Sequence, residues 1–202
     1  MISDTQRSIL EAGKREFLAM GFQDASLRRI AQQAGVTTGA IYGYYADKAA
    51  LFQALVEPTA ADFKARFIGM QQAFTTMPPE AQIKSMRTYS SDALQSFLDD
   101  IYAHYDVFRM LVCSAAGTAY EQYIESLVEI EAASTKAFVE TLVGAGFGPF
   151  TLSDNMFHIL ANAYFSAIFE TVAHGMSKAE ADAYVAQITE FFSAGWLALF
   201  HL

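Results

Sequence analysis

Cysteine, proline and charged residues are all scarce in this chain of 202 residues. The single cysteine, Cys113, cannot form an internal disulfide, and residues 1–6 lack a basic-then-apolar signal pattern, so a reducing, cytoplasmic location is expected. Charged residues make up only 17% of the chain and hydrophobic residues 53%, which excludes an intrinsically disordered protein. A chain of this size buries about 70% of its unfolded surface and needs no metal or disulfide to fold.

A long uninterrupted hydrophobic run is also missing. The most apolar stretch, residues 155–169, carries no formal charge, but polar residues such as His158 and Asn162 interrupt it and Glu170 closes it. A helix that spans a bilayer needs about 20 predominantly apolar residues. The sequence therefore predicts a segment buried against protein.

Positive charge is scarce overall but not in the first third of the chain. The net charge is -9. Residues 1–66 hold eight basic and seven acidic side chains, a net charge of +1, whereas the remainder carries -10. The first third can therefore approach a polyanion in spite of the acidic total.

Apolar residues recur at helical spacing along nearly the whole chain, and no strand-like alternation is found, so the expected fold class is all-α. A first helix is expected to begin at an Asp4 cap and to end at Gly21. Ser26 is expected to cap a short second helix that ends at Gly35, and Thr37 to cap a short third helix.

A fourth helix is expected from Lys48, with Pro58 kinking or interrupting it. A linker is expected at Pro78 and Pro79. Ser177 and Glu180 form a capping box that opens the last helix. Five later helices are expected over residues 80–104, 105–116, 118–143, 154–174 and 178–200.

Three short helices with a glycine-containing turn between the second and third have the plan of a helix-turn-helix DNA-binding domain. The spelling of residues 27–45, LRRIAQQAGVTTGAIYGYY, with Lys48 and Leu51 after it and Ser26 before it, resembles the TetR family of transcriptional repressors. The resemblance covers about residues 5–56. It implies a homodimer formed through the last two helices and a helical carboxy-terminal domain whose small-molecule ligand releases DNA.

We accordingly expect a helix-turn-helix domain over residues 1–48 and an effector-binding and dimerisation domain over residues 49–202. The expected partners are a double-stranded DNA operator, a second copy of the chain and a largely apolar or aromatic small molecule, with no membrane involved. Repression is the expected outcome of DNA binding. No cofactor is expected.

The expected DNA contacts lie around the third helix. Thr37, Thr38 and Gly39 stand at its amino end, where hydroxyls and methyls can meet base edges and the missing side chain lets the backbone approach. Tyr42 and Tyr44 can reach phosphates. The family pattern often has histidine at position 44, where this chain has tyrosine.

Further phosphate contacts are expected at two helix starts, from Lys48 on the fourth helix and from Ser26 and Arg28 on the second. Residues 37–47 contain no Arg, Lys, Asn or Gln, so the usual bidentate partners of guanine and adenine are missing. Specificity is then expected from thymine methyl contacts and DNA shape. This gap also supports an alternative, a helical small-molecule-binding protein or enzyme whose front segment no longer binds DNA.

The effector site has several candidate residues in the later helices. His158, Asn162 and Phe165 project from one side of a predicted helix, and Glu131 lies among apolar neighbours on another. The other candidates are apolar or aromatic wall residues and one arginine: Phe63, Phe67, Phe97, Ile101, Tyr105, Arg109 and Tyr123. Each has a plainer interpretation, because His158 and Asn162 suit a core or dimer interface equally and Glu131 suits an ion pair with Arg109 or Arg87.

Catalytic and metal signals are weak. The four histidines are far apart in the sequence, with no carboxylate at ligand spacing. There is no Gly-x-Ser-x-Gly motif, and Cys113 lies in an apolar segment without a histidine signature. No enzyme and no metal site are expected.

Overall fold

The computed structural model describes residues 2–148, 150 and 152–200, and for residues 85–93 and 154 only the backbone. Every regular element in those ranges is an α-helix, which confirms the all-α prediction. The chain divides into two compact units. One consists of Met1–Asp62 and His104–Tyr123, and the other of Phe63–Ala103 and Ile124–Leu202.

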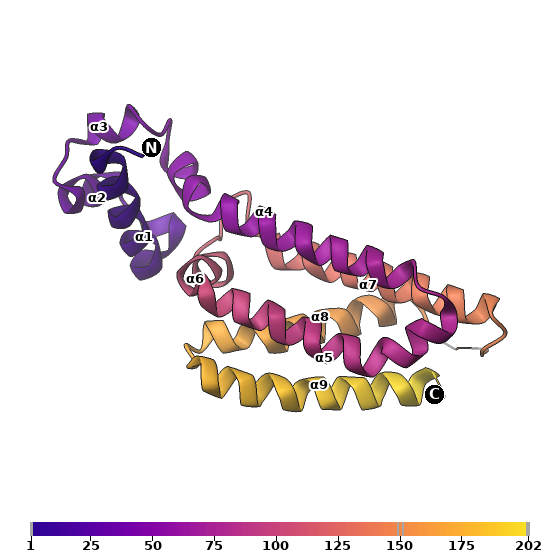
Figure 1. Cartoon of the computed structure of the whole chain (residues 1–202). Coiled ribbons are helices and arrows are strands. Elements are labelled where there is room, and N and C mark those ends of the chain that lie inside the picture. Colours follow the sequence, from indigo (N-terminus) through magenta and orange to yellow (C-terminus); the bar gives the residue numbers. More distant parts are fainter. Residues whose placement is uncertain (1, 149, 151, 201–202) are drawn as a thin grey trace. The chain divides into compact units, whose positions relative to one another are not determined.

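The N-terminal unit contains α1 (Asp4–Asp24), α2 (Leu27–Ala34), α3 (Thr38–Tyr42), the first half of α4 (Lys48–Thr75) and α6 (Tyr105–Cys113). Helix α1 packs against both α2 and α6, and α2 packs against α3 (Figure 1). The centre of this unit is fully buried and includes Phe17, Ile30, Ile41 and Phe52. These residues come from four different helices, so a single core fixes the three short helices together.

Both ends of α1 differ from the sequence prediction. Ser3, not Asp4, caps the helix, because its hydroxyl accepts a hydrogen bond from the Gln6 N–H at 3.2 Å. Gly21 does adopt a positive φ of 72°, but it forms a kink and the helix continues to Asp24. One extra turn therefore follows the glycine.

The turn between α2 and α3 agrees with its sequence. Gly35 has a left-handed conformation, with φ 68° and ψ 29°, and its N–H donates to the last carbonyls of α2. Thr37 caps α3 by accepting a hydrogen bond from the Ala40 N–H at 3.1 Å. Ser26 occupies the cap position of α2, although its side chain makes no capping bond.

The second unit contains the second half of α4 together with α5 (Pro79–Ala103), α7 (Tyr123–Gly144), α8 (Asp154–Ala173) and α9 (Lys178–Phe200). Helix α9 runs beside both α5 and α8 (Figure 1). The predicted capping box opens α9, since the Glu180 carboxylate accepts hydrogen bonds from the Ser177 N–H and hydroxyl. The break between α4 and α5 falls at Pro78, as predicted.

One predicted interruption and one predicted boundary in this helical chain were wrong. Pro58 lies inside α4 and does not interrupt it, since Val56 and Ala60 on either side of it are buried and hold the helix in place; the kink predicted at Pro58 stays a prediction. Residues 114–122 form turns, so α6 ends at Cys113 and α7 begins only at Tyr123. The Thr118 hydroxyl stabilises these turns by donating to the Ala115 carbonyl at 2.7 Å.

None of the described helices is both long enough and apolar enough to span a lipid bilayer.

Candidate functional site

The amino end of α3 is an open surface. Thr37 and Gly39 are exposed and Thr38 is partly exposed, whereas Ile41 of the same helix is fully buried. The Thr37 oxygen accepts the capping bond from Ala40, so its hydroxyl hydrogen is left to donate outward. A short helix whose exposed residues have small side chains can approach a base edge closely.

Two tyrosines extend this surface past the end of α3. Tyr42 is 55% exposed and Tyr44 is 43% exposed, while Tyr45 is buried at 7%. The Tyr44 hydroxyl lies 3.0 Å from the Ser3 hydroxyl, which ties the start of the chain to this surface. Tyr45 therefore belongs to the core of this unit, whereas Tyr42 and Tyr44 belong to its surface.

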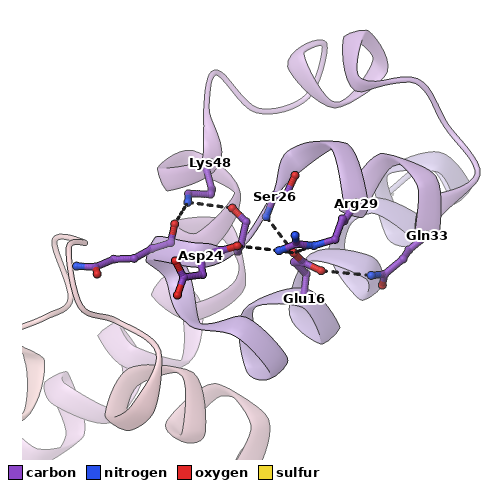
Figure 2. A network of polar contacts seen from close by, with 8 residues as sticks. Glu16, Asp24, Ser26, Arg29, Gln33 and Lys48 are labelled. Atoms are coloured by element: carbon purple, nitrogen blue, oxygen red, sulfur yellow. Dashed lines mark hydrogen bonds and ion pairs between the residues drawn. The ribbon is translucent and has the colours of Figure 1, made fainter.

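A buried carboxylate supports the start of α2 (Figure 2). Glu16 on α1 is only 4% exposed. Its oxygens accept hydrogen bonds from the Ser26 N–H at 2.9 Å, from Arg29 Nε at 2.6 Å and from Gln33 Nε2 at 3.3 Å. Glu16 thus accepts the backbone N–H of the residue that precedes α2, and it fixes the start of α2 to α1.

The two adjacent arginines of α2 have different surroundings. Arg29 donates to Glu16 and, through Nη2, to the Asp24 carbonyl at 2.7 Å. Arg28 is exposed, and among the described residues it has no hydrogen-bond or ion-pair partner. Arg28 therefore remains available for a phosphate, whereas Arg29 holds the α1–α2 junction.

Lys48 opens α4, as predicted, but its ammonium is already engaged by the protein (Figure 2). It donates to the Gln23 carbonyl at 2.9 Å and to the Ala25 carbonyl at 3.0 Å. It also lies 4.6 Å from the centre of the Phe22 ring. Two of its three N–H donors stabilise the end of α1, so one remains for a phosphate.

Sequence reasoning missed Glu16. A signal was present, because position 16 falls on the stripe formed by Ile9, Ala12, Gly13 and Phe17, all of which are buried. A carboxylate on the apolar face of a helix has to find hydrogen-bond donors when it is buried. Arg29, whose role the sequence leaves undefined, supplies one of them and adds a positive charge.

The second unit encloses a cavity of about 170 Å³ between α4, α5, α7, α8 and α9. Six of the predicted effector-site residues line it: Phe63, Phe67, Phe97, Ile101, Glu131 and Phe165. The structure adds polar and aromatic residues that the sequence did not single out, among them Gln71, Ser134, Thr135, Tyr164, Thr189 and Trp196.

Five other predicted effector residues are not brought to the cavity. Tyr105, Arg109 and Tyr123 belong to the N-terminal unit, where the Tyr123 hydroxyl donates to the Ala60 carbonyl at 2.9 Å. His158 and Asn162 are exposed on α8, and the His158 Nε2 atom lies 3.6 Å from Glu125 Oε1 of α7, so neither lines the cavity.

The polar part of the cavity is centred on Glu131, which is partly buried. Its carboxylate accepts hydrogen bonds from Gln71 Nε2 and from the Thr135 hydroxyl. Burial raises the pKa of Glu131, and these two hydrogen bonds oppose the shift. Burial likewise raises the pKa of Tyr164 to about 12, so this hydroxyl stays neutral at ordinary pH. The ion pair with Arg109 or Arg87 is not among the bonds found, and the Arg87 side chain lies outside the described residues.

No group of three or more His, Cys, Asp or Glu side chains suited to a metal ion occurs among the residues whose side chains are described.

Comparison with known proteins gives matches at the sequence and the fold level. Residues 9–55 match the family model of bacterial regulatory proteins, tetR family. The HTH-type transcriptional regulator TtgR of Pseudomonas putida is 44% identical over 54 residues, which are 27% of this chain and 26% of TtgR. The repressor BepR of Brucella suis is 41% identical over 54 residues, again 27% of this chain and 26% of BepR. The matched segment thus spans about a quarter of these relatives.

Over nearly the whole chain, the fold resembles that of solved regulators. A TetR-like regulator from Rhodococcus sp. RHA1 superposes with a TM-score of 0.60 at 21% identity, covering 95% of this chain and 96% of the other. FadR from Bacillus subtilis, solved with stearoyl-CoA, has a TM-score of 0.60 at 13% identity and covers 94% of this chain and 98% of its own. At these identities the likeness concerns the fold alone.

Proposed function

We propose that this chain, which belongs to the tetR family of bacterial regulatory proteins, is a dimeric transcriptional repressor that binds a pseudo-palindromic DNA operator and is released by a small molecule. The observation that carries the proposal is the exposed amino end of α3 on a rigid base. Thr37 and Gly39 are open to solvent while the adjoining turn and the α1–α2 junction are fixed by Gly35 and Glu16.

In this proposal α3 of each subunit enters a major groove. The two copies read half-sites about 34 to 36 Å apart, one turn of B-DNA. Thr37 and Thr38 contact base edges, Tyr42 and Tyr44 reach phosphates, and Ser26, Arg28 and Lys48 anchor the flanking backbone. Because no long amide or cationic side chain lies on α3, DNA shape and thymine methyl groups contribute much of the specificity.

The proposed dimer interface is formed by α8 and α9. These neighbouring helices expose large apolar side chains, with Phe191 72% and Ile159 57% exposed. Exposed apolar area of this kind marks a protein contact surface in a soluble protein. His158 and Asn162, which are also exposed on α8, fall within this proposed interface.

The cavity is the proposed effector site, and the protein acts by binding, without a catalytic step. FadR of the same fold holds an acyl-CoA, which supports a small-molecule role for the equivalent unit here. An effector that prefers a conformation with unsuitable α3 spacing lowers DNA affinity by its differential binding free energy. Helix α4 belongs to both units and is therefore a direct covalent link between them.

The alternative function is a helical binding protein that no longer contacts DNA, and the absence of Arg, Lys, Asn and Gln from residues 37–47 is its support. Selection from a random duplex library separates the two functions. Enrichment of an inverted repeat supports the repressor. A library that stays random even at low salt, where phosphate contacts are strongest, supports the alternative.

A further inference from the structure

The cavity in the second unit has walls that favour an aromatic or bulky apolar ligand. Eleven of the 21 described residues that line it are aromatic. Several of the rings meet edge to face: the ring centres of Phe63 and Phe97 are 4.9 Å apart, and those of Phe67 and Phe165 are 5.6 Å apart. Aromatic faces carry partial negative charge and attract cations as well as apolar groups.

Glu131 is the one charged side chain among the described residues that line this cavity. The hydrogen bonds to its carboxylate come from neutral groups, Gln71 and Thr135. The Gln71 amide is itself held in place, because its oxygen accepts a hydrogen bond from the Ser134 hydroxyl at 2.7 Å. These bonds orient the carboxylate, and none of the described residues that line the cavity supplies a counter-ion for its negative charge.

A carboxylate in such surroundings discriminates among ligands by charge. Removal from water is costly for an ion unless an opposite charge compensates it. A positively charged nitrogen supplies that compensation, and the ring faces add to it. A negatively charged ligand would be repelled, and a neutral one would leave the carboxylate uncompensated.

From these observations we infer that the effector is a lipophilic organic cation, with an aromatic or bulky apolar body against the rings and its positive nitrogen beside Glu131. The inference rests on the proposed function, since it names the ligand class of the proposed effector site.

A matched ligand series tests the inference on the unmodified protein. Calorimetry at neutral pH would compare (2-naphthylmethyl)trimethylammonium, 2-naphthylmethanol and 2-naphthylacetate, which share one aromatic body and differ in charge. We expect the cation to bind at least about tenfold more tightly than the alcohol, which corresponds to one charge-assisted contact, and the anion to bind most weakly. Tighter or equal binding of the alcohol or the anion, or no binding of the cation at millimolar concentration, overturns the inference.

Two variants test whether Glu131 is the source of the preference for the cation. Glu131→Gln keeps the size of the side chain and removes its charge, so it should abolish the preference for the cation. Glu129→Gln makes the same change on an exposed residue of the same helix and should leave all three affinities unchanged. Retained preference in a folded Glu131→Gln variant, verified by circular dichroism, contradicts the inference.

The pH dependence gives a further readout. Because burial raises the pKa of Glu131, a proton competes with the cation, and cation affinity should fall as the pH decreases through that pKa. The other titratable group among the described lining residues is Tyr164, which stays neutral, and the described lining residues of α4, α5 and α9 are all uncharged. The affinity of Glu131→Gln for the cation should not change with pH, whereas the affinity of the parent should fall as the pH decreases. A parent affinity that does not change with pH contradicts the inference.

These experiments need no DNA, so their failure is distinct from failure of the repressor proposal. If 2-naphthylmethanol binds best and still releases DNA, the effector class is wrong and the proposed function stands. If the protein never binds DNA but binds the cation through Glu131, the proposed function is wrong and the ligand class stands.

Discussion

The Arg29 guanidinium lies 2.6 Å from the buried Glu16 carboxylate, whereas the adjacent Arg28, exposed like Arg29, has no hydrogen-bond or ion-pair partner among the described residues. Two neighbouring residues of the same type therefore have separate roles at the start of α2. Glu16 gathers a backbone N–H, a guanidinium and an amide, and it is the hub of the junction between α1 and α2.

Substitution of each arginine should affect a different property. Glu16→Gln and Arg29→Ala should each lower the free energy of unfolding by about 1 to 3 kcal/mol, because hydrogen bonds to a charged group are lost. Arg28→Ala should leave stability unchanged and weaken DNA binding at every sequence. Urea denaturation and fluorescence anisotropy measure the two effects. A destabilised Arg28→Ala variant, or a fully stable Glu16→Gln variant, would contradict this division.

Two glycines of the helix-turn-helix should respond in opposite ways to alanine. Gly35 has a left-handed φ of 68°, so Gly35→Ala should cost about 1 to 2 kcal/mol of stability even though no atom blocks the new methyl group. At Gly39 a methyl group meets only Thr37 Oγ1 at 3.7 Å, so Gly39→Ala should fold normally. It should nevertheless weaken DNA binding because the methyl faces the groove. Equal DNA affinity of Gly39→Ala and the parent would remove Gly39 from the interface.

A charge on α9 should disrupt the proposed dimer. Phe191 is 72% exposed, so Phe191→Asp costs little in the isolated subunit but places a carboxylate in an apolar interface. Sedimentation should report a monomer, with operator affinity reduced along with dimerisation. Val143→Asp, at a side chain 51% exposed on α7, is the matched control and should remain dimeric. A dimeric Phe191→Asp variant would place the interface elsewhere.

The contact between α5 and α9 should weaken in acid. The Lys178 ammonium lies 2.7 Å from Asp99 and 2.5 Å from Asp182, and its hydrogen bonds lower the pKa of both carboxyl groups. Carboxyl groups with a lowered pKa in the folded state contribute stability above their unfolded pKa of about 4 and lose it as the pH falls through the folded value.

Asp182→Asn should therefore be less stable than the parent at pH 7, and the difference should disappear near pH 3. Denaturation at the two pH values measures this. Glu190→Gln, on an exposed residue of the same helix, should match the parent at both. A difference that persists undiminished at pH 3 would rule out the ionised carboxylate as its source.

Local signals predicted local structure well in this chain. Gly35, Thr37 and the Ser177–Glu180 pair act within one helical turn, and each adopts the predicted conformation. Pro58 shows the limit of such signals, because burial on both sides of a proline outweighs its intrinsic tendency to break a helix. The late start of α7 depends on turns around Thr118 that periodicity does not reveal.

The site residues show the same difference between local signals and contacts of residues distant in the sequence. Exposure of Tyr42 and burial of Tyr45 follow from helical spacing. The cavity could be predicted only in part, because its walls come from five helices that are distant in sequence. The hydrogen bond from Gln71 to Glu131, for example, depends on how α4 packs on α7. The sequence predicts only a phosphate as the partner of Lys48. It does not reveal the two carbonyl partners, because they lie more than 20 residues away in the sequence.

The most direct test of the central claim, that two copies of α3 read one duplex as a twofold pair, is a spacing experiment on the selected operator. Anisotropy would compare the operator with versions carrying about 5 or about 10 extra base pairs between half-sites, half a helical turn or a full one. The account predicts that the half-turn insertion abolishes cooperative binding because the second half-site rotates to the opposite face of the DNA. Binding that is indifferent to this insertion, or that needs only a single half-site, would contradict it.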